Sequence, residues 1–320
     1  MGSGIDVGSY YAAAKALGDL VGYWRLGNGE EPYLDTSEFD PGDPADLSIV
    51  TGAAAMTKDL TPGALPGGWD DGAVSFPTLT DKVQRFAGGS NTTGLSGEQD
   101  YLETTMGAGT TGNNDRFRFE GNVPFSVAAW VWLLPDAVET FNGGIISCPA
   151  FFGLGPRYVG WRVYGAWNPV YPSAAVWFNR GQPATGVPPV SVAGYAPADQ
   201  WFHMCGTYDG TSAIKLYLNG GLADSDTDTD ALINDDQNDV QIGFEFRSEN
   251  LGGSLTHTEY NDLYGKVDEA AIWSKELTAG EVASLATLGN TDSAEAEGKV
   301  LTANGTGGTS WEYPTIEVTY

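Results

Sequence analysis

Hydrophobic and polar residues alternate with a period of two along several stretches of the chain, and the clearest stretch is 125–133. Phenylalanine, valine, alanine and leucine occupy every second position there, and two of the intervening positions are tryptophan. Successive side chains of a strand point to opposite faces of its sheet, so both faces of this strand carry large side chains. We therefore expect a central strand that is covered on both sides.

Further β-rich stretches predict strands at 21–26, 201–208, 214–218, 240–246 and 265–273. The dipeptide Asn219-Gly220 predicts a tight hairpin, because both residues tolerate the positive φ angles of a two-residue turn. The predicted strands do not alternate with helices, as those of a parallel sheet do. The pattern therefore favours an all-β fold of two packed antiparallel sheets.

Two segments have helical patterns instead. The alanine-rich segment Ser9–Leu20 predicts a short helix. Thr278 and Glu281 form a capping box at the start of a second helix, and Gly289 is a natural stop for it. A polar, acidic stretch follows. We therefore expect a sandwich domain over residues 1–289 and, over 290–320, a linker with a C-terminal β-appendage.

The appendage is predicted to end in a strand, 315–320, that has no later segment to pair with. Such an exposed strand is either disordered or added to the edge of a neighbour's sheet, and we favour the second interpretation. The chain is then expected to form a homo-oligomer through this region. The residues expected to serve assembly are Val300, Leu301, Trp311, Tyr313, Ile316 and Val318.

The charge balance narrows the choice of partners. Asp and Glu total 42 against 15 Lys and Arg, which gives a formal net charge of −27. Nucleic acid is a poor partner, because neutralising phosphates needs clustered basic residues. Met1–Gly8 has neither the basic residues nor the apolar core of a signal peptide. No run approaches the roughly 18 apolar residues that cross a membrane, so no membrane partner is expected.

Several segments follow one another in a distinctive order. They are Gly22–Leu26, Pro124–Val131, Trp201–Gly210, Leu216–Gly220, Gly265–Trp273 and Leu277–Val282. In this order they resemble the laminin G-like, concanavalin A-like jelly-roll family. The opening Tyr23-Trp24-Arg25-Leu26 has a form that is frequent among phage-encoded members. The resemblance covers roughly residues 20–288 and implies a two-sheet antiparallel jelly-roll sandwich with one or two short helices. Residues 141–192 match only loosely.

The C-terminal segment Gly298–Trp311 resembles a segment of bacteriophage fibre and head-appendage proteins. This second resemblance implies a virion component, such as a decoration, head-fibre or tail protein. Such a protein is made in the host cytoplasm and assembles with other virion proteins.

The family resemblance also implies a structural Ca²⁺ site. Relatives often bind calcium through the aspartate that stands where Asp268 stands, with oxygens from an early acidic turn that Asp35 and Ser37 match. Ca²⁺ takes several oxygen ligands, which these residues and nearby carbonyls can supply. The alternative is that Asp268 caps a turn or pairs with Lys266 or Arg25.

Catalytic patterns are not evident. Glucanases of this fold carry E-x-D-x-E or E-x-D-x-x-E on one strand, and neither 245–249 nor 98–102 has that spacing. His203 stands between bulky residues in a predicted strand and is expected to be packed. No Cys/His spacing suggests zinc. Cys148 and Cys205 are expected to be small buried hydrophobes, with a disulfide left open. We predict that the chain is not an enzyme.

Four aspartates alternate between positions 224 and 230, but neither frame has the glycine and glutamate of an EF-hand loop. We expect a solvated acidic loop or a sheet edge that is protected from pairing.

Large aromatic residues gather between positions 161 and 177. They are Trp161, Tyr164, Trp167, Tyr171 and Trp177. Flat rings stack on the apolar faces of sugars, so these residues are carbohydrate-binding candidates in loops on a rigid scaffold. Burial in the core or at a subunit interface is the alternative, and it weighs more because large aromatics are commonly buried.

Three hypotheses about function follow. The first is a non-enzymatic bacteriophage virion protein that displays a laminin G-like module, with surface polysaccharide as a ligand. The second is a carbohydrate-binding module without a virion role. The third is a cryptic glycan hydrolase or lyase, which would need carboxylates that meet in space from different strands.

Overall fold

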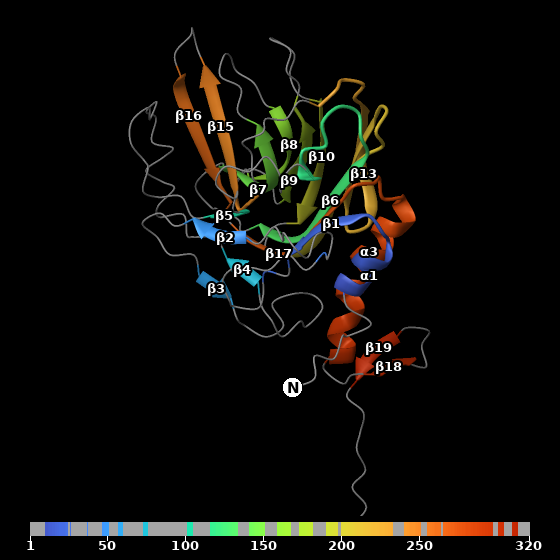
Figure 1. Cartoon of the computed structure of the whole chain (residues 1–320). Helices are drawn as coiled ribbons and strands as arrows, with labels where there is room; N and C mark the ends of the chain where they lie inside the picture. The colour runs from blue at the N-terminus through green and yellow to red at the C-terminus, as the bar shows by residue number, and fades with distance from the viewer. Residues whose placement is uncertain are drawn as a thin grey trace, which may run out of the picture.

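Two antiparallel sheets pack face to face in the computed structural model (Figure 1). The structure describes residues 10–24, 26, 37, 47–50, 57–59, 73–75, 101–104, 116–133, 141–150, 159–167, 173–181, 190–197, 200–232, 240–250, 255–263, 265–296, 300–303 and 309–312.

The first sheet has eight strands, and its central member is the strand predicted at 125–133. Its order is β13 (Gly221–Thr227), β12 (Ala213–Leu218), β11 (Trp201–Tyr208), β6 (Phe125–Leu133), β17 (Gly265–Trp273), β4 (Ala73–Ser75) and β3 (Thr57–Asp59). The remaining strand, β1 (Leu20–Trp24), also pairs with β17.

The second sheet has seven strands and carries the loosely matching middle of the chain. Its order is β10 (Val190–Pro197), β9 (Ser173–Arg180), β8 (Val159–Trp167), β7 (Phe141–Ala150), β14 (Gln241–Ile242), β5 (Tyr101–Thr104) and β2 (Leu47–Val50). Two separate hairpins are formed by β15 (Phe244–Asn250) with β16 (Leu255–Asp262), and by β18 (Val300–Ala303) with β19 (Thr309–Glu312).

The main core lies between the two sheets. The ring of Phe125 on β6 contacts those of Phe178 on β9 and Trp161 on β8, at centroid distances of 5.8 and 5.9 Å. Close packing also needs Gly206 on β11, because a Cβ added there would lie 2.6 Å from the Phe178 ring. The predicted two-sheet sandwich is confirmed.

A second apolar cluster covers the outer face of the eight-stranded sheet. Helix α1 (Tyr10–Ala16) and helix α3 (Ala279–Ala296) contact each other on this side of the molecule (Figure 1). Trp273 of β17 is fully buried beneath them, and its Nε1 donates to the carbonyl of Ala14 at 3.1 Å. The prediction that β6 is covered on both sides is therefore confirmed. Neither described helix is long and apolar enough to cross a membrane.

The hairpin turn and the helix cap that short sequence motifs predict are both present in the structure. Asn219 and Gly220 have φ angles of 49° and 79° and form the predicted hairpin turn between β12 and β13. In the capping box, the Thr278 N–H donates to Glu281 Oε2 at 2.7 Å, and the Glu281 N–H donates to Thr278 Oγ1 at 3.3 Å. Cys148 and Cys205 are buried, and they form no disulfide.

The predicted end of the second helix is wrong. Helix α3 continues past Gly289 to Ala296. A glycine inside a helix costs about 1 kcal/mol relative to alanine, and this does not end a helix when helix-forming residues such as Ala294 and Glu295 follow. Of the predicted appendage, 300–303 and 309–312 form an antiparallel hairpin. The side chains of Val300, Leu301 and Trp311, and the whole of Tyr313, Ile316 and Val318, lie outside the described residues.

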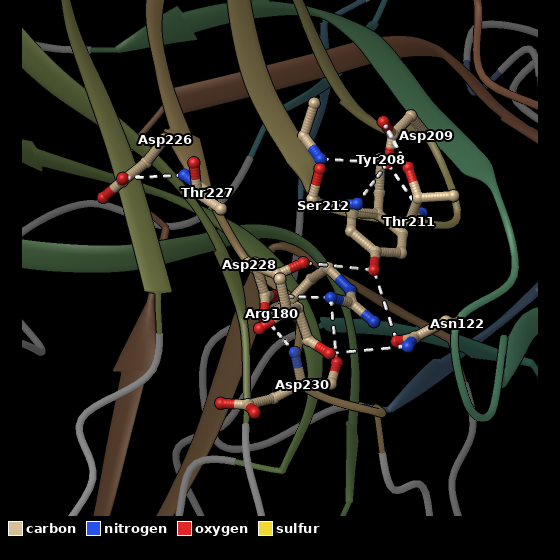
Figure 2. A network of polar contacts seen from close by, with 12 residues as sticks. Asn122, Arg180, Tyr208, Asp209, Thr211, Ser212, Asp226, Thr227, Asp228 and Asp230 are labelled. Carbon is tan, nitrogen blue, oxygen red and sulfur yellow. Dashed lines mark hydrogen bonds and ion pairs between the residues drawn. The ribbon is translucent and has the colours of Figure 1, made fainter.

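A buried ion pair joins the sheets at one end of the sandwich (Figure 2). Arg180 ends β9, and its Nη1 donates to Asp228 Oδ2, just after β13, at 2.5 Å. Both side chains are 1% exposed. The guanidinium also donates to the carbonyl of Gly121 at 3.2 Å and lies 3.5 Å from the ring centroid of Tyr208. This network fixes the end of β9 against the opposite sheet.

A second polar contact lies under α1. The Tyr10 hydroxyl and His203 Nε2 are 2.9 Å apart, and the His203 ring meets Trp130 edge-on at 5.4 Å. Complete burial lowers the pKa of His203 to about 3, so the ring is neutral near pH 7. Burial also raises the pKa values of Tyr10 and of the Cys205 thiol. His203 is a packed residue, as the sequence predicted.

Removing one partner of the Arg180–Asp228 pair should destabilise the fold strongly. We expect Arg180→Met to lower the free energy of unfolding by about 3–5 kcal/mol, because it leaves a buried carboxylate without its cation. The double variant Arg180→Met, Asp228→Leu should lie closer to the native chain than either single variant. Urea unfolding measures all four chains, and additive losses in the double variant would contradict the ion-pair interpretation.

Acidification should weaken the fold through His203. The unfolded chain has an ordinary histidine pKa of about 6.5, whereas the folded pKa is about 3. The contribution of neutral His203 to the free energy of unfolding is therefore fully present above pH 6.5. It is lost progressively as the pH falls toward 3. Between pH 7 and pH 5 the loss is roughly 2 kcal/mol. Urea unfolding at both pH values should show this slope in the native chain and in His257→Gln, and a much smaller slope in His203→Phe.

Candidate functional site

The outer side of β8, β9 and β10 carries half-exposed aromatic rings, and we call this surface the aromatic face. The antiparallel register places Tyr164 of β8 opposite Trp177 of β9, and Trp177 opposite Ala193 of β10. The rings of Tyr164 and Trp177 stack, with centroids 5.1 Å apart and planes 9° apart. The alternation that turns Val163, Val176 and Val192 toward the core turns these residues outward.

A polar row lies beside the aromatic pair. Arg162 of β8, Asn179 of β9 and Ser191 of β10 stand opposite one another. The Arg162 guanidinium lies 4.9 Å from the ring centroid of Tyr164. With the Asn179 amide oriented to satisfy both of its ends, its oxygen accepts from Arg162 Nη2 at 3.1 Å and its nitrogen donates to Ser191 Oγ at 3.0 Å. The row thus joins a cation to two neutral hydrogen-bonding groups.

On the other side of the pair, Tyr195 of β10 stands opposite Ala175 of β9. Tyr195 is 73% exposed, which is unusual for so large a side chain. Its ring therefore extends the aromatic surface into solvent next to two small residues, Ala175 and Ala193. The aromatic face combines flat apolar surface with polar groups at its border, as ligand-binding surfaces do.

The edge of the aromatic face is closed by the other sheet. Asp224 of β13 accepts a hydrogen bond at 3.0 Å from the backbone N–H of Ala193 on β10. Gly194 lets the strands approach, because an added Cβ would lie 2.7 Å from Leu218 and 2.8 Å from Ala223. This contact occupies an N–H of the β10 edge and places a carboxylate at the border of the aromatic face.

Of the aromatic residues that the sequence predicts as carbohydrate-binding candidates, some are buried in the core and others lie on the outer side of the sheet. Trp161 is fully buried in the main core, and its Nε1 donates to the carbonyl of Phe117 at 2.7 Å, so the core interpretation applies to it. Tyr164 and Trp177 come together on the outer side. The side chain of Trp167 and the whole of Tyr171 lie outside the described residues. Tyr195 was missed, although the alternation along 190–197 turns it outward.

The predicted calcium ligands are only partly described. Asp268 is fully buried, and its Oδ1 accepts from the backbone N–H of Glu269 at 2.7 Å. Glu269 has a φ of 51° in a β-bulge and accepts a hydrogen bond from the Tyr23 hydroxyl. Ser37 is buried, and Asp35 lies outside the described residues. Within the described part of the chain, no three His, Cys, Asp or Glu residues are grouped to hold a metal. Calcium at Asp268 stays a prediction.

The alternating aspartates are shared between a sheet edge and the buried ion pair. All seven residues of β13, Asp224 and Asp226 among them, are exposed at the edge of the eight-stranded sheet, as predicted. Asp228 differs, because it is buried with Arg180. Asp209 lies in the turn before β12; although burial raises its pKa, hydrogen bonds from the backbone N–H groups of Ser212, Ala213 and Thr211 lower it to about 2. This aspartate therefore serves the turn (Figure 2).

Comparison with known proteins agrees with this architecture. A family model described as the concanavalin A-like lectin/glucanases superfamily matches residues 96–283. No curated protein sequence matches the chain.

Similar solved structures include the binding domain of botulinum neurotoxin serotype C1, with a TM-score of 0.51 and 11% identity, over 88% of this chain and 53% of that one. Two others have TM-scores of 0.50 and cover 84% of this chain and 51% of theirs. One is botulinum neurotoxin type C, whose cell entry depends on two ganglioside molecules, at 14% identity. The other is the binding domain of botulinum neurotoxin DC in complex with SialylT, at 12% identity.

The chain spans about half the length of these structures, and at such identities the likeness concerns the fold. The family model, in contrast, covers more than half of this chain, and the two facing antiparallel sheets agree with it. The chain belongs to the concanavalin A-like lectin/glucanase superfamily.

Proposed function

We propose that the chain is a non-enzymatic carbohydrate-binding module whose ligand lies on the aromatic face. The observation that carries this proposal is the stacked pair of Tyr164 and Trp177 on the outer side of a rigid sheet. The apolar C–H faces of a sugar pack on flat aromatic rings, while its hydroxyls need donors and acceptors at the border. Ser191 and Asp224 are such groups, since both are exposed.

The similar solved structures support the proposal by analogy of fold. Two of them concern toxins that engage sugar-bearing molecules, a ganglioside in one and SialylT in the other. A shared fold does not by itself transfer a ligand, because function lies in particular sites. The aromatic face of this chain is therefore the basis of the proposal.

We further propose that the module is displayed on a bacteriophage virion, where host-surface polysaccharide is its ligand. The support is the likeness of Gly298–Trp311 to phage fibre and head-appendage segments, together with the β18–β19 hairpin in this region. A separate two-stranded hairpin offers strand edges to a sister subunit or another virion protein. We also keep the proposal that a Ca²⁺ ion at Asp268 has a structural role in the module.

Removal of the Trp177 ring should weaken recognition without unfolding the chain. We expect Trp177→Ala to weaken binding to a recognised polysaccharide by roughly tenfold or more, since aromatic residues dominate such contacts. Trp132→Ala is the matched control, because it removes a half-exposed tryptophan ring from β6 of the other sheet. Glycan-array binding followed by calorimetry measures both variants, and unchanged binding in Trp177→Ala would remove the aromatic face as the ligand site.

Deletion of residues 299–320 tests the virion role separately. The cut falls after the end of α3 at Ala296, so it removes β18 and β19 and leaves the helix that covers the sheet. We expect the shortened chain to keep its melting temperature and glycan binding but to lose oligomer formation and incorporation into particles. Light scattering and particle purification measure these. A shortened chain that still assembles would contradict the proposed role of this segment.

A further inference from the structure

The polar row beside the aromatic pair gives the aromatic face a chemical preference. We propose that its ligand is an acidic glycan, and that Arg162 binds the carboxylate of a sugar residue stacked beside it. This inference rests on the proposed function, because it assigns a ligand class to the same surface.

Arg162 is held in place by its neighbours. Its guanidinium lies over the Tyr164 ring and donates to the oxygen of Asn179 at 3.1 Å. Asn179 is itself 2% exposed, and its nitrogen donates to Ser191 Oγ and to the backbone carbonyl of Phe178. The cation is therefore oriented before a ligand arrives, which lowers the entropic cost of binding. The planar fork of a guanidinium matches the two oxygens of a carboxylate.

The spacing of the rows suits one sugar residue. Arg162 and Tyr164 are two positions apart on β8, which corresponds to about 6.5–7 Å along a strand. A sugar ring that packs on the aromatic pair therefore places an exocyclic carboxylate at the height of the polar row. Ala193, opposite Trp177, is small and leaves room above β10 for the next sugar residue of the glycan.

Asp224 sets the orientation of the ligand. It lies at the β10 edge of the aromatic face, whereas Arg162 lies two strands away on β8. A carboxylate accepts hydrogen bonds from sugar hydroxyls and repels a second carboxylate. The acidic group of the sugar is therefore directed toward Arg162, and hydroxyl groups toward Asp224.

The net charge of the whole chain opposes an acidic ligand at long range, so the preference for a carboxylate can act only at contact with Arg162. A net charge of −27 repels an anionic polymer at long range. The attraction to Arg162 acts only at contact, where packing and hydrogen bonds fix the pair. Adding salt up to the physiological range should therefore raise the association rate, whereas binding through a general basic surface would become slower.

The test compares each glycan with its own uncharged form. A glycan array is printed twice, once with native polysaccharides and once after reduction of their carboxyl groups to alcohols. Both arrays include glycans whose only charged groups are sulfate esters. We expect the native chain to prefer carboxylated glycans over their reduced forms by about tenfold, the size of one charge-assisted contact.

Two substitutions then separate charge from stacking. Arg162→Gln should erase the preference while it keeps the weaker binding to reduced glycans, and Arg162→Lys should restore part of it. Lys266→Gln is the matched control, since it removes a cation from β17 on the other sheet and should leave the preference intact. Near-ultraviolet circular dichroism confirms that each variant is folded.

The outcomes distinguish this inference from the proposed function. Equal binding of native and reduced glycans, lost together in Trp177→Ala, overturns the acidic ligand and leaves the carbohydrate-binding module standing. The preference for carboxylates is also overturned if glycans charged only by sulfate esters bind as tightly as carboxylated ones, because the site would then select any anion. If the folded chain binds no glycan on either array, the proposed function fails and the inference fails with it.

Discussion

Burial of β6 on both faces is the constraint that decides which outer sheet face is covered by helices. Its inner side chains, such as Phe125, lie in the core between the sheets, and its outer Trp130 lies under α1 and α3. The helices therefore occupy the outer side of the eight-stranded sheet. The corresponding side of the seven-stranded sheet keeps Trp177 half-exposed and Tyr195 largely exposed, so the proposed ligand surface lies there.

The same strand carries the aromatic face and the ion pair that anchors it. Along β9, Trp177 and Asn179 point outward, and the next residue, Arg180, turns inward to Asp228 on the far side of the core. Rigid elements hold binding groups more accurately than loops do. The buried pair therefore does more than join two sheets, because it limits how far the outward side chains of β9 can shift.

Local patterns were enough to predict most of the fold but only part of the site. Alternation identified β6, and the Asn219-Gly220 turn and the Thr278 capping box act over a few residues, so they are legible in the sequence. Which face of β8 meets the core depends on its pairing with β7 and β9. For this reason Trp161 and Tyr164 looked equivalent in the sequence although one is buried and the other is not. Tyr195 gained significance only when β10 was placed beside β9.

The role of the acidic residues depends on where each carboxylate lies in the structure, as the aspartates of and after β13 show. On β13 the exposed Asp224 and Asp226 stand along the edge of the eight-stranded sheet. Asp224 accepts from the Ala193 N–H there, and the like charges oppose pairing with another chain. Two residues later Asp228 is buried and neutralises Arg180. One alternating run therefore contains an edge-protecting part and a core part, and the change between them occurs where the chain leaves the strand. Charge counted over the whole sequence describes solubility, whereas the function of each carboxylate follows from its place in the sheet.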